Sequence, residues 1–146
     1  MATIDRSADA AWSGDLLKGS GTVALASSGA ASLPVTWASR VEDPDGRTSP
    51  EELIAAAHAS CFAMAFSHTL ATAGTPPDRL AVTAVVSLAP KEGGGFQVTR
   101  SALTVTGVVP GIDQAAFQAT AEQAEKGCPI SNALRAIEIT VTATLE

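Results

Sequence analysis

Two cysteines are the residues of this chain whose types point most directly to chemistry. Cys61 lies in the middle of an alanine-rich stretch, and Cys128 directly precedes Pro129. A lone cysteine in an apolar helix usually serves as a small buried residue. Burial also raises the pKa of a thiol and suppresses the reactive thiolate. Cys61 therefore needs a nearby positive charge if it is to act as a nucleophile.

Cys128 has the more favourable local electrostatics. It stands where a short helical turn is expected to begin, and unpaired N–H groups and the helix dipole favour a thiolate at such a position. On local electrostatics alone, Cys128 is the preferred nucleophile. In a reducing compartment, two cysteines are more often reactive or inert thiols than a permanent disulfide.

An arginine ahead of the helix can supply the positive charge that Cys61 lacks. At roughly 100° per residue, Glu51 lies about 80° from Cys61 around the helix, whereas Glu52 falls on the opposite side. A guanidinium from Arg40 or Arg47, held by Glu51 in a bidentate pair, would place a fixed charge near the thiol. The residues alone do not choose between the two arginines. Glu51 also suits the first turn for its effect on the helix dipole, and either arginine suits a solvated loop.

The element that must position Cys61 is a helix expected over residues 49–74. Ser49 is a good N-cap, Pro50 suits the first helical position, and Glu52 is expected to reach back to the Ser49 backbone N–H in a capping box. Gly74, followed by two prolines, predicts the end of the helix. The stretch is apolar almost all round, which is typical of a helix buried in a core. A membrane span is not expected, because charged and polar residues interrupt the apolar run and no basic flank anchors it.

The remaining elements are predicted from alternation, capping residues and turns. A second helix is expected from the N-cap Asp113 to Gly127, with Ile112 and Phe117 as a hydrophobic staple, and a short helical turn then runs to Leu134. Strands are expected over residues 10–12, 21–26, 33–41, 80–88, 96–109 and 136–145. This order predicts an α+β fold with mostly antiparallel sheet, formed by residues 1–146 as a single domain.

Length, composition and charge limit the classes to which this protein can belong. The 146 residues are 46% hydrophobic and 16% charged, which excludes a disordered chain and suggests that another subunit covers some apolar surface. The net charge of −6, with no basic run, argues against a nucleic-acid partner. The first residues, MATIDRSADAAW, lack the apolar region of a secretory signal, so a cytoplasmic location is expected.

Metal and phosphate sites are not predicted. His58 and His68 lie ten residues apart on different sides of the expected helix, and no C-x-x-C or H-x-x-x-H spacing occurs. The glycines that follow Lys91 lack both a following helix and the Lys/Ser ending of a phosphate-binding loop. They are interpreted as a hairpin turn, and no cofactor is expected.

Four segments together carry a family resemblance: AWSGDLLKGSGTV, TSPEELIAAAHASCFAMAFSHTL, VPGID and KGCPISNAL. P-E-x-L followed by a helical cysteine, with a distant G-C-P-[IV]-S, is a specific combination. The chain resembles the OsmC/Ohr family of organic hydroperoxide reductases over nearly its whole length, and within that family the OsmC branch.

The resemblance implies a fold, an assembly and roles for four residues. It implies antiparallel sheets wrapped around two central helices in an intertwined homodimer, with two active sites at the subunit interface. Cys61 matches the peroxidatic cysteine, Cys128 the resolving cysteine, and Glu51 the carboxylate of P-E-x-L. The arginine on the strand before the central helix matches Arg40 better than Arg47. The resemblance thus reverses the local preference for Cys128 as nucleophile.

The implied activity is a thiol-dependent peroxidase that prefers organic hydroperoxides to hydrogen peroxide. Cys61 would become a sulfenic acid, Cys128 would condense with it to form a disulfide, and an external dithiol would reduce that disulfide. Two alternatives stay open. One is a redox sensor that uses the same cysteine pair with slow turnover, and the other is a small-molecule or acyl-chain binding module in which Cys61 only packs.

Overall fold

The structure is a computed structural model that describes residues 1–146. The chain divides into two compact units, Met1–Leu53 and Ile54–Glu146. That the whole chain forms one domain stays a prediction.

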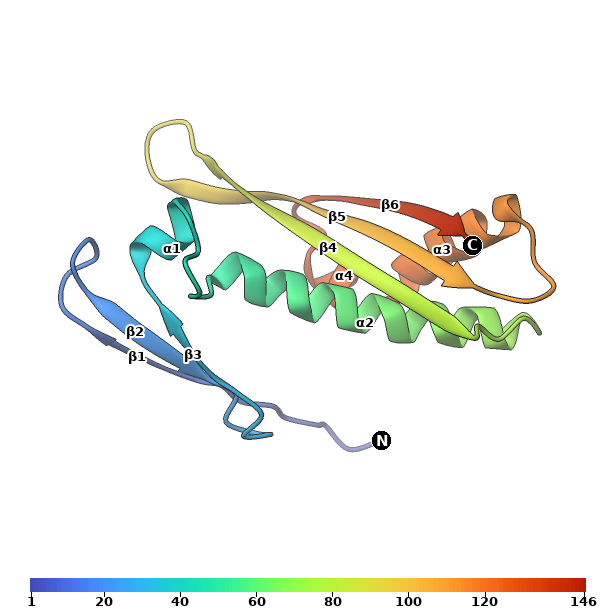
Figure 1. Cartoon of the computed structure of the whole chain (residues 1–146), viewed down its shortest axis with the longest axis horizontal. Helices are drawn as coiled ribbons and strands as arrows, with labels where there is room; N and C mark the ends of the chain where they lie inside the picture. The colour runs from blue at the N-terminus through green and yellow to red at the C-terminus, as the bar shows by residue number, and fades with distance from the viewer. The chain divides into compact units, whose positions relative to one another are not determined.

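The first unit contains a small antiparallel sheet of three strands in the order β1-β2-β3 (Figure 1). Its strands are β1 (Asp9–Ser13), β2 (Ser20–Ala24) and β3 (Ser32–Val35). The prediction of three strands in this region is confirmed. All five residues of β1 are exposed in the chain, Trp12 among them, so the unit presents an apolar surface.

The third strand is shorter than its alternating pattern predicts. Residues Trp37–Val41 form helix α1, so the expectation of a strand through Val41 is wrong. The cause is a capping box: the Thr36 hydroxyl accepts from the Ser39 N–H, and the Ser39 hydroxyl accepts from the Thr36 N–H, each at 3.1 Å. Arg40 consequently lies in the last turn of a short helix and not on a strand.

Helix α2 (Pro50–Thr72) is the predicted long helix. The Ser49 hydroxyl accepts from the Glu52 N–H at 3.2 Å, as an N-cap should. The expected return bond from Glu52 to the Ser49 backbone is replaced, because the Glu52 carboxylate accepts from the Thr48 hydroxyl at 2.6 Å. Gly74 follows the helix with a φ of +86°, a left-handed conformation that favours glycine and ends the helix as predicted.

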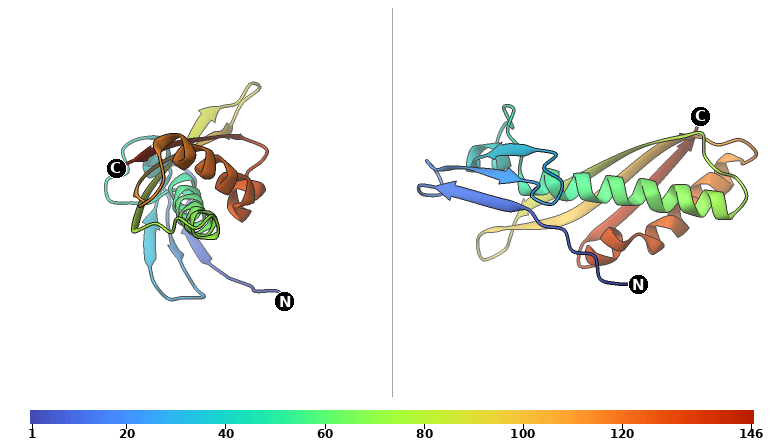
Figure 2. Two further views of the ribbon diagram at one scale, coloured as in Figure 1. Left: turned by 90° about the vertical axis from the view of Figure 1, so that its right-hand side faces the viewer. Right: turned by 90° about the horizontal axis from the view of Figure 1, so that it is seen from below.

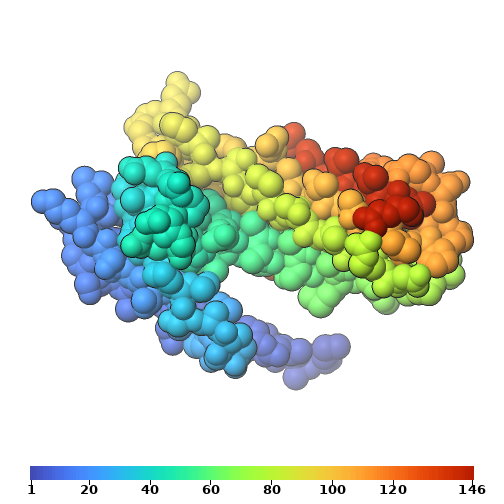
Figure 3. Space-filling view, viewed as in Figure 1, coloured from blue at the N-terminus to red at the C-terminus, as the bar shows by residue number.

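The second unit contains a sheet in the order β4-β5-β6, with β4 (Arg79–Pro90), β5 (Phe96–Val108) and β6 (Glu138–Leu145). Strands β4 and β5 form the predicted antiparallel hairpin, whose turn is closed by a bond from the Lys91 N–H to the Gly95 carbonyl at 2.9 Å. The tip of this hairpin projects from its unit (Figure 3). Strand β6 pairs with β5 in parallel, because two helices connect them and return the chain to the same end of the sheet.

Those helices are α3 (Gln114–Gly127) and α4 (Pro129–Ala133). Asp113 caps α3 as predicted, since its side chain accepts from the Ala116 N–H at 2.8 Å. Cys128 is both the C-cap of α3 and the N-cap of α4, so the cap lies one residue after the expected Gly127. A sharp junction between two helices therefore fixes the backbone of Cys128.

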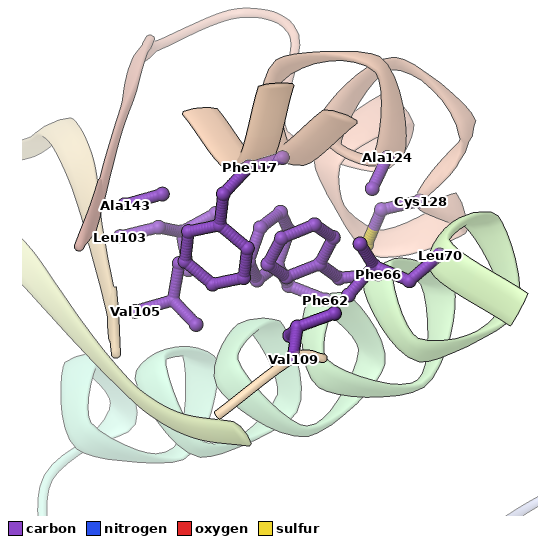
Figure 4. Packing of buried hydrophobic residues seen from close by; sticks show 11 residues of the cluster. Phe62, Phe66, Leu70, Leu103, Val105, Val109, Phe117, Ala124, Cys128 and Ala143 are labelled. Atoms are coloured by element: carbon purple, nitrogen blue, oxygen red, sulfur yellow. The ribbon is translucent and has the colours of Figure 1, made fainter. Parts of the chain in front are cut away.

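The core of the second unit lies between helices α2 and α3 and one face of the sheet (Figure 2). Three phenylalanines form its centre (Figure 4): the ring of Phe66 lies 5.6 Å from that of Phe62 and 5.0 Å from that of Phe117, between ring centroids. Leu103 and Val105 of β5 cover them.

By length and composition alone α2 could cross a membrane, which is weak evidence because core helices pass the same test. Its Phe62 and Phe66 are completely buried in this core.

Two valines on neighbouring strands test which face of the sheet forms the core. Val105 is completely buried, whereas Val85 is 53% exposed. Val105→Ala removes two methyl groups from a packed site, and we expect it to lower the free energy of unfolding by about 2 to 3 kcal/mol. Val85→Ala is the matched control, with an expected loss below about 1 kcal/mol. Urea unfolding followed by circular dichroism measures both, and equal losses would contradict the assigned core face.

Candidate active site

The two cysteines lie in contact although 67 residues separate them in the sequence. Their Sγ atoms are 3.2 Å apart, both thiols are free, and the Cys128 S–H donates to the Cys61 sulfur. Cys61 is half-buried on α2, whereas Cys128 is completely buried at the start of α4. Figure 4 shows the Cys128 sulfur at the edge of the core, directed toward α2. The more accessible sulfur is therefore that of Cys61.

A backbone N–H at the N-terminus of α4 donates to the Cys61 sulfur. Burial raises the pKa of the Cys61 thiol, while a hydrogen bond from the backbone N–H of Ile130 lowers it. The side chain of Cys128 makes no capping bond. The free N–H group that sequence reasoning assigned to Cys128 thus stabilises a thiolate at Cys61. Because burial is the largest effect, the pKa of Cys61 in the isolated chain lies above its ordinary value.

A cavity of about 380 Å³ opens beside Cys61. It is lined mainly by small and apolar side chains: Cys61, Met64, Ala65, His68, Thr69, Ala124, Gly127 and Pro129. Of the apolar residues near Cys61 in the sequence, Met64 reaches this cavity, whereas Phe62 and Phe66 lie in the core. The space next to the sulfur suits an alkyl group better than a charged one.

Arg40 and Glu51 form a bidentate ion pair in the first unit. The Arg40 Nε lies 3.1 Å from both Glu51 carboxylate oxygens, and its Nη2 lies 2.8 Å from Oε1. Glu51 is 7% exposed, and its hydrogen bond keeps the pKa of Arg40 above its already high ordinary value. Arg47 instead pairs with Asp45 at 3.0 Å on the exposed surface. Of the two arginines that the sequence left open, the partner of Glu51 is Arg40.

Apolar side chains accompany this ion pair. The Arg40 guanidinium lies 5.9 Å from the centroid of the Trp37 ring, within the range of a cation–π contact. A cavity of about 200 Å³ beside it is lined by Trp12, Leu16, Val35, Thr36, Trp37, Arg40 and Pro50. A fixed positive charge thus borders an apolar hollow.

Glu51 and Cys61 share a side of α2, but ten residues of α-helix span about 15 Å along its axis. The four predicted residues are therefore found as two pairs: Arg40 with Glu51, and Cys61 with Cys128.

His58 is a residue that sequence reasoning considered only as a metal ligand. Its imidazole is completely buried, with Nδ1 2.6 Å from the Ser101 Oγ and Nε2 2.7 Å from the Ser131 Oγ. Burial is the largest effect and lowers its pKa, Glu125 opposes this by raising the pKa, and Arg135 adds a smaller lowering. The sequence signal for a functional role was a histidine amid apolar residues, three positions before Cys61. Its hydrogen-bond partners could not be predicted from residue spacing.

Comparisons with known proteins agree with these features. A family model described as OsmC-like protein matches residues 43–143. Peroxiredoxin OsmC of Escherichia coli (strain K12) is 43% identical over 144 residues, covering 99% of both chains, and that of Shigella flexneri matches equally well.

Solved structures give the same family. An organic hydroperoxide resistance protein from Elizabethkingia anophelis matches with a TM-score of 0.76 and 27% identity over 100% of both chains. The organic hydroperoxide resistance protein OsmC from Legionella pneumophila matches with a TM-score of 0.77 and 25% identity over 99% of both. A full-length relative at this identity, joined to the α+β fold and the paired cysteines, shows that the chain belongs to the OsmC family.

Proposed function

We propose that this protein is a cysteine-based peroxidase that reduces organic hydroperoxides to alcohols, and hydrogen peroxide more weakly. The observation that carries the proposal is the 3.2 Å contact between two free thiols, one of which borders an apolar cavity. The names of its relatives, peroxiredoxin OsmC and organic hydroperoxide resistance protein, support the same activity.

In the first step, the Cys61 thiolate attacks the distal oxygen of the hydroperoxide. An S–O bond forms, the O–O bond breaks, and the departing alkoxide takes a proton and leaves as the alcohol. Cys61 is the proposed nucleophile because it is the more exposed of the two cysteines and accepts a hydrogen bond from the Ile130 N–H, which lowers the pKa of its thiol. Arg40 stabilises the thiolate and the charge that develops on the peroxide.

In the second step, the Cys128 sulfur attacks the sulfur of the Cys61 sulfenic acid. An S–S bond forms, the S–O bond breaks, and water leaves. The Sγ atoms must shorten their separation from 3.2 Å to the roughly 2.05 Å of a disulfide, which is a small movement. An external dithiol then reduces the disulfide by exchange and restores both thiols. No cofactor takes part.

The complete site is proposed to require two copies of the chain. Glu51, which holds Arg40, precedes Cys61 by ten residues on α2, a rise of about 15 Å along the axis of an α-helix, and we infer that the charge for Cys61 comes from a second copy. In a homodimer, Arg40 and Glu51 of one protomer act on Cys61 of its partner. Exposed apolar side chains, including Trp12, Leu16 and Met64, support an assembly that covers them. The apolar hollow beside Arg40 then supplies a wall for the alkyl group of the substrate.

A cytoplasmic location is part of the proposal. The cycle needs both thiols to return to the reduced form, and two sulfurs in contact would remain oxidised in a compartment without a reductant.

Stopped-flow kinetics test the activity. Reduced wild type is expected to consume cumene hydroperoxide faster than hydrogen peroxide, because an alkyl group fits the cavity beside Cys61. Cys61→Ser should be inactive. Cys128→Ser should react once and then stop without forming the internal disulfide. Peroxide consumption by Cys61→Ser would contradict the role of Cys61, no reaction in wild type would favour the binding module, and ready disulfide formation with slow turnover in wild type would favour the redox sensor.

Hybrid dimers test the two-chain site. A purified hybrid of an Arg40→Met chain with a Cys61→Ser chain, each carrying a different tag, has one complete site if Arg40 acts on its partner. We expect this hybrid to be active although both parent homodimers are nearly inactive.

The reciprocal control joins a wild-type chain with an Arg40→Met, Cys61→Ser chain. This hybrid has no complete site if Arg40 acts on its partner, and one complete site if Arg40 acts within its own chain. Activity in the control hybrid alone would contradict the proposed arrangement.

The roles of Arg40 and Arg47 are distinguished by their effects on the pKa of the Cys61 thiol. In a Cys128→Ser background, Arg40→Met removes the fixed positive charge and should raise the pKa of Cys61, so that alkylation by iodoacetamide requires a higher pH. Arg47→Met is the matched control, because that guanidinium pairs with exposed Asp45, and it should leave the profile unchanged. A shift with Arg47→Met alone would assign the role to Arg47.

A further inference from the structure

Three buried polar side chains form a continuous hydrogen-bonded chain behind the cysteines. Ser101 of β5, His58 of α2 and Ser131 of α4 are each completely buried, and the imidazole bridges the two hydroxyls at 2.6 and 2.7 Å. A neutral imidazole donates through one nitrogen and accepts through the other, and a hydroxyl can play either role, so every member is satisfied. The chain ties one strand and two helices together beside the apolar core.

This hydrogen-bonded chain stands in a fixed relation to the sulfur pair. His58 precedes Cys61 by three residues on α2, and Ser131 follows Cys128 by three residues on α4. Residues three apart on a helix are neighbours on its surface. The contacts between α2 and α4 therefore come as a pair: a hydrogen bond from His58 to Ser131 beside the contact of Cys61 with Cys128.

Helix α4 depends on such contacts for its position. It has five residues, far fewer than a helix needs to be stable by its own hydrogen bonds. Its N-cap side chain makes no capping bond, and Ser131 is its one completely buried polar side chain. Leaving a buried hydroxyl or imidazole without a partner is costly, so the bond to His58 resists displacement of α4.

We propose that His58 is a positioning residue for disulfide formation, which acts through Ser131 to hold α4 so that the Cys128 sulfur reaches the Cys61 sulfenic acid. The inference rests on the proposed function, because it concerns the second step of that cycle. Both ring nitrogens of His58 bond to serine hydroxyls, so the imidazole is placed to act through Ser131 and not on the peroxide. Its loss should therefore slow the attack of Cys128 and leave the attack of Cys61 on peroxide nearly unchanged.

Two serines provide a matched pair for the test. Ser131→Ala and Ser101→Ala each remove one completely buried hydroxyl and one hydrogen bond to the same imidazole, but only Ser131 lies on the helix that carries Cys128. Single-turnover mixing with one equivalent of cumene hydroperoxide separates the rate of peroxide consumption from the rate of disulfide formation. Mass spectrometry after excess peroxide measures over-oxidation of Cys61 to sulfinic acid, which competes with disulfide formation.

We expect Ser131→Ala to slow disulfide formation about tenfold and to increase over-oxidation, with peroxide consumption within about twofold of wild type. Ser101→Ala should leave both rates within about twofold of wild type. Ser131→Thr keeps the hydroxyl and should restore disulfide formation. His58→Gln, whose amide can reach the position of Nε2, should form the disulfide faster than His58→Asn, whose amide can reach only that of Nδ1. If Ser131→Ala does not fold, the comparison of His58→Gln with His58→Asn tests the proposed role of His58.

Equal slowing by both serine variants, or by both His58 variants, would indicate general loosening of the core and overturn the inference. Unchanged disulfide formation in Ser131→Ala would also overturn it. These failures differ from failure of the proposed function, in which wild type itself would consume no peroxide or form no disulfide.

Discussion

The contact between the sulfurs of Cys61 and Cys128 is the interaction on which the proposed chemistry depends. At 3.2 Å the two atoms touch without being bonded, so a small movement separates the reduced from the oxidised pair. The long helix α2 fixes one sulfur, because Phe62 and Phe66 anchor that helix in the core. The junction between α3 and α4 fixes the other, and α3 is anchored by Phe117 against Phe66. The aromatic core is thus the support of the cysteine pair.

Burial that fixes the Cys61 thiol also opposes its ionisation. It raises the pKa of Cys61, and the Ile130 N–H offsets only part of that effect in the isolated chain. The proposed chemistry needs a further positive charge near Cys61. The Arg40 guanidinium, which pairs with Glu51, can supply it. In the proposed homodimer, a second copy supplies this charge, because Glu51 of the same chain precedes Cys61 by ten residues on α2. In this proposal, assembly of the dimer therefore activates Cys61.

Local signals in the sequence predicted the elements that carry the site. Ser49, Pro50 and Gly74 mark α2, and Asp113 marks α3, because capping and chain termination depend on neighbours within a few residues. The same kind of local signal was overlooked at Thr36, whose capping box with Ser39 turns an alternating stretch into helix α1. The pairing of Glu51 with Arg40 also followed from the wheel and the family resemblance.

Contacts between residues that lie far apart in the chain could not be predicted from the sequence. His58 bonds to residues 43 and 73 positions away, and no spacing rule connects them. The parallel pairing of β5 with β6 follows from the path of α3 and α4 across the sheet. The hydrogen bond from the Ile130 N–H of α4 to Cys61 depends on how two helices pack. The contact between the cysteines is tertiary as well, and only the resemblance anticipated it.

Intact-mass analysis after one equivalent of cumene hydroperoxide tests the central claim most directly. Reduced Cys128→Ser should gain the mass of one oxygen atom, and peptide mapping after trapping with dimedone should locate it on Cys61. Wild type should lose two hydrogen atoms and yield a peptide joined through Cys61 and Cys128. Rapid oxidation of Cys128 in the Cys61→Ser protein, with Cys61 unreacted in Cys128→Ser, would show that the roles of the two cysteines are reversed.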